Sequence, residues 1–248
     1  MTITPEEKLM YEVMRAIYES GIPISFKGSM VLKAFLIEAG YAEDTRHTVD
    51  IDANWNSESQ PTEKQMTESL QKAFDSHDIN LDVQSYRQYG EGRSAGFEIT
   101  DRTTGELLFT MDIDVNRPAP ETKMYEVDGL RFCGASPYSM IADKVSVIST
   151  DRVFRRVKDV VDLYYASKVI PFNRARIEYM LRNSKRHIGN FDGFLHRTED
   201  LKHAYEKFRF TGDIEKPPFE EVYRTVRTYI RSILPRERDM DECVKGFL

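Results

Sequence analysis

Two aspartates separated by one residue, Asp50 and Asp52, form the carboxylate pair from which the chemistry of this chain can be argued. Side chains two residues apart in a β-strand point to the same face, about 7 Å apart along the strand. Neighbouring carboxylates repel each other unless a cation lies between them, and Mg²⁺ prefers hard oxygen ligands of this kind. The pair therefore predicts a magnesium site on one face of a strand.

The dipeptide Gly28-Ser29 lies about twenty residues before this pair, at the expected start of a strongly apolar helix. The free backbone N–H groups and the dipole of a helix N-terminus attract phosphate. A Gly-Ser dipeptide is common in proteins, and its position ahead of Asp50 and Asp52 is what favours a nucleotide site. Lys27 lies on the same turn, where it has either a structural or a nucleotide-binding role.

A third carboxylate is expected from the strand at residues 109–115. Strand alternation places Asp112 and Asp114 on one face and the apolar residues between them on the other. We predict Asp112 as the additional metal ligand and keep Asp114 as the alternative. A solvated strand face without a metal would show the same pattern.

The order of these motifs resembles the nucleotidyltransferase superfamily that includes polymerase-β-like enzymes. The resemblance is closer to the AbiEii/AbiGii-type toxins of bacterial toxin–antitoxin systems and extends over roughly residues 20 to 165. It is carried by four blocks: Lys27-Gly28-Ser29, Arg46-x-Thr48-x-Asp50-Ile51-Asp52, Ile141-Ala142-Asp143-Lys144 and Arg156-Val157-Lys158-Asp159.

This resemblance implies a role for each block. Asp50 and Asp52 would share two Mg²⁺ ions, and Gly28 and Ser29 would hold the β- and γ-phosphates of an NTP. Lys144 would contact the nucleotide phosphates, and Asp159 matches an active-site aspartate of the family. A surface ion pair between Arg155 and Asp159, four residues apart on a helix, is the alternative for Asp159. Arg46 and Thr48 would orient Asp50 or touch the base or the phosphates.

Charge is distributed unevenly along the 248 residues, whose net charge is −6. Residues 1–135 hold 13 Lys and Arg against 24 Asp and Glu, and residues 136–248 hold 22 against 17. An acidic half suits divalent metal and a basic half suits phosphate-rich partners, although ordinary solvated surfaces would give the same counts. The two cysteines and five histidines match no metal-binding spacing, so neither zinc nor a disulfide is expected.

Periodicity and turn residues predict an α+β protein with a nucleotidyltransferase-like α/β lobe at 1–135 and a helical lobe at 136–248. The sheet of the first lobe is expected to be mixed and largely antiparallel. The expected helices are 5–20, 30–39, 61–76, 138–149, 151–168, 173–183, 198–208 and 219–234. The expected strands are 22–26, 47–53, 81–88, 95–100, 107–115, 124–127 and 130–133.

The expected function is a Mg²⁺-dependent transfer of NMP from an NTP to a tRNA 3′ end or a protein hydroxyl, by a toxin with a cognate antitoxin. A non-catalytic nucleotide- or RNA-binding module is the alternative from another class, and a phosphotransferase or phosphodiesterase on the same scaffold is a third. The sequence has no apolar run of 18 residues and no signal-peptide pattern, which predicts a cytoplasmic protein without a membrane partner.

Overall fold

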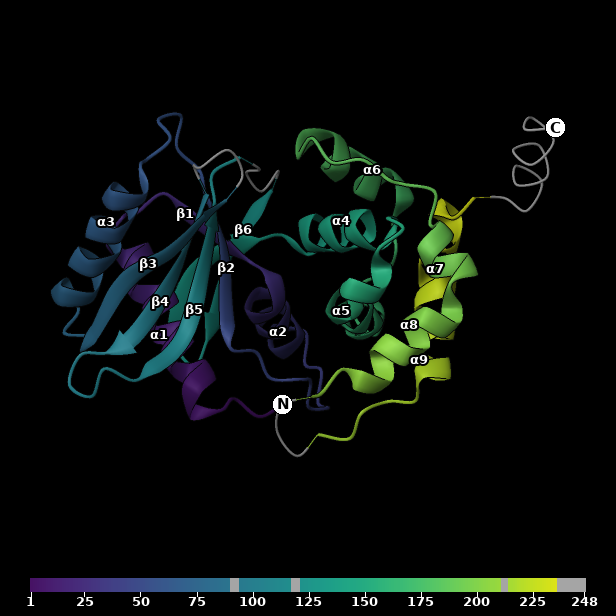
Figure 1. The fold of residues 1–248 in the computed structure, drawn as a ribbon, viewed down its shortest axis with the longest axis horizontal. Helices are drawn as coiled ribbons and strands as arrows, with labels where there is room; N and C mark the ends of the chain where they lie inside the picture. The colour runs from purple at the N-terminus through teal and green to yellow at the C-terminus, as the bar shows by residue number, and fades with distance from the viewer. Residues whose placement is uncertain (90–93, 117–120, 211–213, 236–248) are drawn as a thin grey trace. The chain divides into compact units, whose positions relative to one another are not determined.

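The computed structural model describes residues 1–89, 94–116, 121–210 and 214–235. They form two compact units (Figure 1). The sheet unit comprises the described residues within Met1–Met140 and Phe210–Ile214, and the helical unit comprises those within Ile141–Arg209 and Glu215–Leu248. That residues 1–135 and 136–248 are separate folding domains stays a prediction.

The sheet unit contains a seven-stranded mixed sheet, in the order β3-β4-β5-β2-β1-β7-β6. The pairs β2–β5 and β1–β7 are parallel and the other four are antiparallel, which confirms the expected fold class. The strands are β1 Ile24–Lys27, β2 Asp50–Trp55, β3 Leu81–Tyr89, β4 Ser94–Asp101, β5 Leu107–Asp114, β6 Thr122–Val127 and β7 Leu130–Ala135.

Three helices of this unit begin at signals that the sequence provides. They are α1 Pro5–Glu19, α2 Gly28–Glu38 and α3 Glu63–Ser76. Thr4 and Thr62 each cap a helix by accepting a hydrogen bond from the third helical N–H, and the side chain at that position bonds back. Gly28 instead starts α2 with a φ of +75°, directly after β1.

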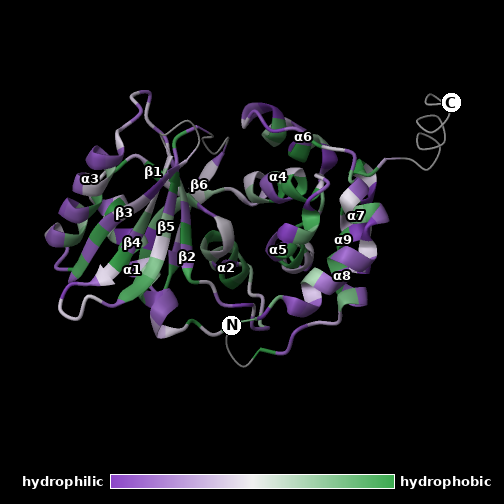
Figure 2. Ribbon diagram, viewed as in Figure 1, coloured by the Kyte–Doolittle hydropathy of each residue, from purple (hydrophilic) through white to green (hydrophobic). Residues whose placement is uncertain are grey.

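One face of the sheet is apolar and packs against helices. Tyr11 of α1 stacks on Phe132 of β7 with ring centroids 5.7 Å apart, and Phe26 meets the same ring edge-on. Val31 of α2 packs against Gly134, which pairs with Phe26 and therefore lies on the same face. Figure 2 shows hydrophobic colouring on α2 and along several strands of the sheet. The opposite face is left for polar side chains.

The helical unit is built around α5, whose described side chains are largely buried. It contacts α8 and α9, and aromatic rings of Phe194, Tyr205, Phe219 and Tyr223 pack pairwise between the elements. The elements are α4 Pro137–Ile148, which crosses the boundary between the units, η1 Val153–Arg155, α5 Val157–Ser167, α6 Arg174–Asn183, α7 Asp192–His196, α8 Thr198–Lys207, α9 Phe219–Tyr229 and η2 Arg231–Ile233. No helix within the described ranges is both long and apolar enough to cross a membrane.

Several expected boundaries were wrong. The helix expected at 151–168 is divided, because Arg156 takes a non-helical conformation with φ −124° and ψ 30° between η1 and α5. The central strand begins at Asp50 rather than at residue 47 and runs to Trp55. The short helix α7, which follows Phe191 in a left-handed conformation with φ 62°, was not expected at all.

Candidate active site

The parallel pairing of β2 with β5 places the predicted carboxylates beside one another. In this register Asp50 pairs with Thr110, Asp52 with Asp112 and Asn54 with Asp114. The residues between them, Ile51, Ala53, Met111 and Ile113, are buried on the apolar face. Paired residues on neighbouring strands are separated by about 4.8 Å, so the aspartates form a compact group on the polar face.

Helix α2 begins against this group. A Cβ atom added to Gly28 would collide with the carboxylate of Asp52, so the backbone at the start of α2 touches that side chain. Lys27 pairs with Asp52 across the β1–β2 ladder. The Nζ atom of Lys27 donates a hydrogen bond of 2.7 Å to Asn54 Oδ1 and lies 3.8 Å from Asp114 Oδ2. These contacts join the helix start and the aspartates into one site.

The segment before β2 holds two of the predicted residues in positions that suit an orienting role. Thr48 Oγ1 donates a 2.5 Å hydrogen bond to Asp50 Oδ1, and Arg46 Nη2 donates to the Ser29 hydroxyl. Thr48 therefore fixes one oxygen of Asp50. Arg46 places a positive charge beside the predicted phosphate-binding turn.

A buried ionic network anchors this segment. Glu7 of α1 is fully buried and lies 2.6 Å from Lys33 Nζ of α2 and 3.1 Å from His47 Nδ1. The side chain of Lys33 is only 3% exposed. His47 lies between Arg46 and Thr48 in sequence, so the network holds both of those residues through the backbone of the segment.

The two candidates for the third carboxylate have different surroundings. Asp114 accepts hydrogen bonds from Ser94 Oγ at 3.1 Å and from the Asn116 N–H at 2.8 Å. Asp112 is paired in register with Asp52 and interacts with Arg87 of β3 at 2.6 Å. The register supports Asp112 as the partner of Asp52, whereas the bonds of Asp114 secure the end of β5. The choice of Asp112 stays a prediction.

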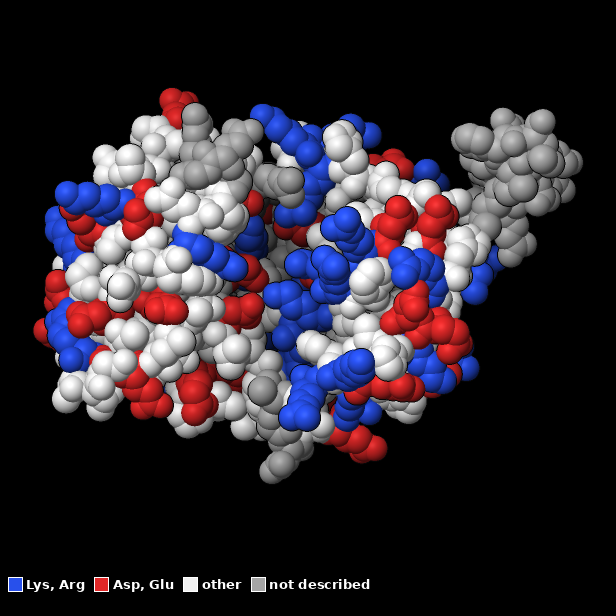
Figure 3. Space-filling model, viewed as in Figure 1, with Lys and Arg blue, Asp and Glu red and all other residues white. Residues whose placement is uncertain are grey.

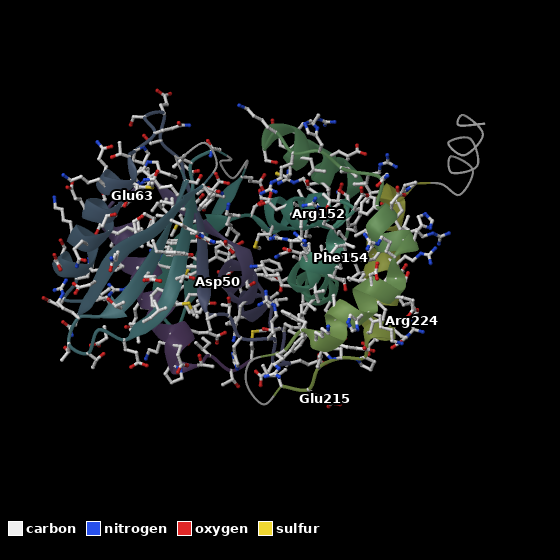
Figure 4. The ribbon with its side chains drawn as sticks, viewed as in Figure 1. Asp50, Glu63, Arg152, Phe154, Glu215 and Arg224 are labelled. Atoms are coloured by element: carbon white, nitrogen blue, oxygen red, sulfur yellow. The ribbon has the colours of Figure 1, made fainter. Side chains whose placement is uncertain are left out.

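The carboxylates also affect the tyrosines beside them. Burial is the main cause that raises the pKa of Tyr89, and the negative charges of Asp112, Asp114 and Asp52 add to it. Burial also raises the pKa of Tyr86, and the negative charge of Asp112 adds to this increase. Figure 3 shows acidic side chains across the visible face of the sheet unit, and Asp50 is labelled in Figure 4.

The helical unit contains the remaining two predicted residues, Lys144 on α4 and Asp159 on α5. Lys144 Nζ lies 2.6 Å from Asp162 Oδ2 and 3.5 Å from Asp159 Oδ1, and all three side chains are at most 8% exposed. Arg156 Nε lies 2.8 Å from Asp159 Oδ2. The alternative of an exposed pair between Arg155 and Asp159 was wrong, because Arg155 belongs to η1 and Asp159 is buried against Arg156 and Lys144.

The structure therefore gathers the predicted residues in two groups. Lys27, Gly28, Ser29, Arg46, Thr48, Asp50, Asp52, Asp112 and Asp114 lie in the sheet unit, and Lys144 and Asp159 lie in the helical unit. Two further residues, Arg87 and Asp162, were not expected from the sequence. A signal for Asp162 existed, since it is an acid within the apolar run Val160-Val161-Asp162-Leu163, where a charge needs a buried partner.

The donor atoms of the first group suit a magnesium ion. Asp50, Asp52 and Asp112 offer carboxylate oxygens on one face of adjacent strands, and hard oxygen donors are what Mg²⁺ requires. Within the described part of the chain, no three His, Cys, Asp or Glu side chains are already arranged as a metal site. Binding would require Asp112 to turn from Arg87 toward the ion.

Known structures resemble the fold of this chain. A search of curated proteins finds no sequence that matches this chain. Among solved structures, the chain resembles MenT4, a nucleotidyltransferase toxin from Mycobacterium tuberculosis H37Rv, with a TM-score of 0.56, 12% identity, and coverage of 96% of this chain and 85% of that one. It also matches an antigenic nucleotidyltransferase-like protein from Paracoccidioides brasiliensis, with a TM-score of 0.49, 15% identity, and coverage of 80% and 91%.

A family model extends over almost the whole sequence. The family described as "Nucleotidyl transferase AbiEii toxin, Type IV TA system" matches residues 10–238. This range includes all of the predicted site residues in both units. The chain belongs to the AbiEii family of nucleotidyltransferase toxins.

Proposed function

We propose that this toxin transfers NMP from a Mg²⁺-bound NTP to a hydroxyl group of a macromolecular acceptor. The observation that carries the proposal is the register of β2 with β5, which pairs Asp52 with Asp112 on the face where Gly28 begins α2. Nucleotidyl transfer needs carboxylates for metal beside backbone N–H groups for phosphate, and this face provides both.

Each predicted site residue of the sheet unit has a defined role in this proposal. Asp50, Asp52 and Asp112 would hold Mg²⁺, with Asp114 as the alternative to Asp112; the bound ions would neutralise the triphosphate and activate the acceptor hydroxyl. The backbone N–H groups at Gly28 and Ser29, together with the Ser29 hydroxyl, would bind the β- and γ-phosphates. Arg46 donates to Ser29 and would add its charge there, and Thr48 keeps Asp50 oriented. Lys27 would steady this end of the sheet through Asn54.

Lys144 and Asp159, which lie in the helical unit, also have roles in this proposal. Lys144 would contact the nucleotide phosphates as a compact positive charge. Its present partners, Asp162 and Asp159, hold the ammonium group in place within a largely buried setting. Arg156 assists by binding the second oxygen of Asp159.

The acceptor would be a tRNA 3′ end or a protein hydroxyl in the cytoplasm, and a cognate antitoxin would restrain the activity. The family's type IV toxin–antitoxin assignment supports the antitoxin. The excess of Lys and Arg in residues 136–248 supports a phosphate-rich acceptor. Figure 3 shows basic side chains gathered on part of the visible face of the helical unit.

Labelled nucleotides test the proposal directly. The purified protein is incubated with Mg²⁺, total tRNA or cell lysate, and each NTP labelled at the α-phosphate or, separately, at the γ-phosphate. Transfer of α-label to an RNA or protein band, absent in Asp50→Ala/Asp52→Ala and in EDTA, is expected. Transfer of γ-label alone would instead establish a phosphotransferase. Metal-independent NTP binding without any transferred label would favour a non-catalytic binding module.

A further inference from the structure

A β-bulge in β3 directs Arg87 toward the carboxylate face. Ser85 pairs with Phe97 and Arg87 pairs with Gly96, so Tyr86 is an extra residue in the ladder. If β3 alternated regularly, with no bulge at Tyr86, Arg87 would lie on the same face as Leu81, Val83 and Ser85, which is the apolar side. One inserted residue in a strand reverses the orientation of the side chains that follow, which is a common use of bulges beside active sites.

Gly96 of β4 provides the path from Arg87 to Asp112. It pairs with Arg87 on one side and with Asp112 of β5 on the other. A Cβ atom at this position would lie 2.8 Å from both Arg87 Nε and Asp112 Oδ1. Because glycine leaves this space empty, Arg87 extends across β4, and its Nη2 lies 2.9 Å and 2.6 Å from the two Asp112 oxygens.

Two tyrosine rings also contact the arginine at this position, in addition to its bonds to Asp112. Its guanidinium carbon lies 5.1 Å from the ring centroid of Tyr86 and 5.6 Å from that of Tyr89, within the range of cation–π attraction. The hydrogen bond to Asp112 is the main cause that raises the pKa of Arg87. The arginine side chain is nevertheless 50% exposed, and ion pairs this accessible to water are weak enough for a stronger cation to replace them.

We propose that Arg87 is a displaceable counter-ion of the cation site: it pairs with Asp112 while no divalent cation is bound and leaves Asp112 when one binds. The inference rests on the proposed function, because the site is the one formed by Asp50, Asp52 and Asp112. A divalent ion carries twice the charge of a guanidinium and binds all three carboxylates, which favours the exchange. Thermodynamic linkage requires the effect to be mutual, so Arg87 weakens cation binding and the cation frees Arg87.

The first measurement is a titration with Mn²⁺, followed by electron paramagnetic resonance of the free ion, on the full-length protein without nucleotide. Arg87→Gln is expected to bind Mn²⁺ about fivefold more tightly than the unmodified protein, the factor for a modest coupling between two sites. Arg102→Gln is the matched control, since Arg102 is 41% exposed and pairs with Asp75 and Asp82 near the other end of the β3–β4 hairpin. An Arg87→Gln affinity equal to that of the unmodified protein, or to that of the control, would overturn the proposal.

The second measurement uses the unmodified chain and therefore does not depend on a variant that folds. Arginine labelling by phenylglyoxal is mapped by peptide mass with and without Mn²⁺. Labelling of Arg87 is expected to rise severalfold when Mn²⁺ binds, while labelling of Arg102 stays constant. In Asp112→Asn, Arg87 should label rapidly whether or not Mn²⁺ is present.

The two measurements distinguish a failure of the counter-ion proposal from a failure of the proposed function. Suppose that the unmodified protein binds Mn²⁺, that Asp52→Asn does not, and that Mn²⁺ leaves the labelling of Arg87 in the unmodified protein unchanged. This result would overturn the proposal that Arg87 is a counter-ion and would leave the proposed cation site intact. Complete absence of Mn²⁺ binding would overturn both. The expected pattern, tighter binding in Arg87→Gln and cation-dependent labelling of Arg87, would establish the exchange at Asp112.

Discussion

The backbone of Gly28 lies so close to the Asp52 carboxylate that position 28 has no room for a side chain. Its φ of +75° also belongs to the left-handed region, which costs other residues about 1–2 kcal/mol. Gly28→Ala should therefore displace Asp52 as well as strain the backbone. Gly21 is the matched control, because its φ is +68° and nothing lies within 4 Å of an added Cβ.

Both alanine variants should lose about 1–2 kcal/mol of unfolding free energy to backbone strain, measured by urea denaturation. Gly28→Ala should in addition lose nucleotidyl transfer, whereas Gly21→Ala should keep it. Equal activity in the two variants would show that the contact between Gly28 and Asp52 has no role in transfer.

Asp52→Asn keeps the shape of the side chain and removes its charge. Loss of one preorganised electrostatic contact should slow transfer about a hundredfold or more, measured with α-labelled NTP at saturating Mg²⁺. Asp128→Asn is a suitable control, because Asp128 lies in the β6–β7 turn with φ 49°, a conformation that asparagine tolerates. A loss of less than threefold in Asp52→Asn would contradict the assigned metal ligand.

Lys144→Met should destabilise the helical unit because it removes a cation 2.6 Å from the carboxylate of Asp162, which is only 4% exposed. Breaking a buried ion pair in this way costs roughly 3–5 kcal/mol of unfolding free energy. The double variant Lys144→Met/Asp162→Asn should recover part of that loss, since it also removes the buried negative charge that faced Lys144. Lys207→Met, at an exposed position on α8, serves as the control and should change stability by less than about 0.5 kcal/mol. A double variant less stable than Lys144→Met would count against this account.

The network of Glu7, Lys33 and His47 predicts a combined effect on stability and substrate binding. Lys33→Met should cost roughly 3 kcal/mol or more, because Glu7 is fully buried beside it. Arg15→Met, on the same helix as Glu7, should cost less than about 1 kcal/mol, because Arg15 and Glu19 form an exposed pair.

Lys33→Met should also raise the KM for NTP, because the segment that contains Arg46 and Thr48 would lose order. Steady-state kinetics of the folded fraction, at a temperature well below the unfolding midpoint of both variants, would measure this. An unchanged KM in Lys33→Met would show that the network contributes to stability and not to NTP binding.

The sequence was sufficient for the elements whose signals are local. Thr4 and Thr62 mark the starts of α1 and α3, and the Asp128-Gly129 turn forms with φ values of 49° and 79°, as a type I′ turn requires. The shared face of Asp50 and Asp52 follows from strand alternation alone. These features depend on neighbours within a few residues, which a single sequence contains.

The features that were missed depend on contacts between distant segments. Nothing in the sequence fixes the register that pairs Asp52 with Asp112, because β2 and β5 are joined through three other elements. The bulge at Tyr86 reverses the face of Arg87, which simple alternation assigns to the apolar side. Gly96, an isolated glycine in a strand, was the available signal for a close approach at that point.

The parallel pairing of β2 with β5 also determines how early the proposed carboxylate site can form during synthesis. The first two aspartates leave the ribosome about sixty residues before the third, and β5 must then insert between β2 and β4. Pairings between segments so far apart form late, because the intervening chain must first be ordered. Until β5 has been synthesised and has paired with β2, the growing chain therefore lacks the third of the proposed carboxylates, and the proposed transfer could not begin.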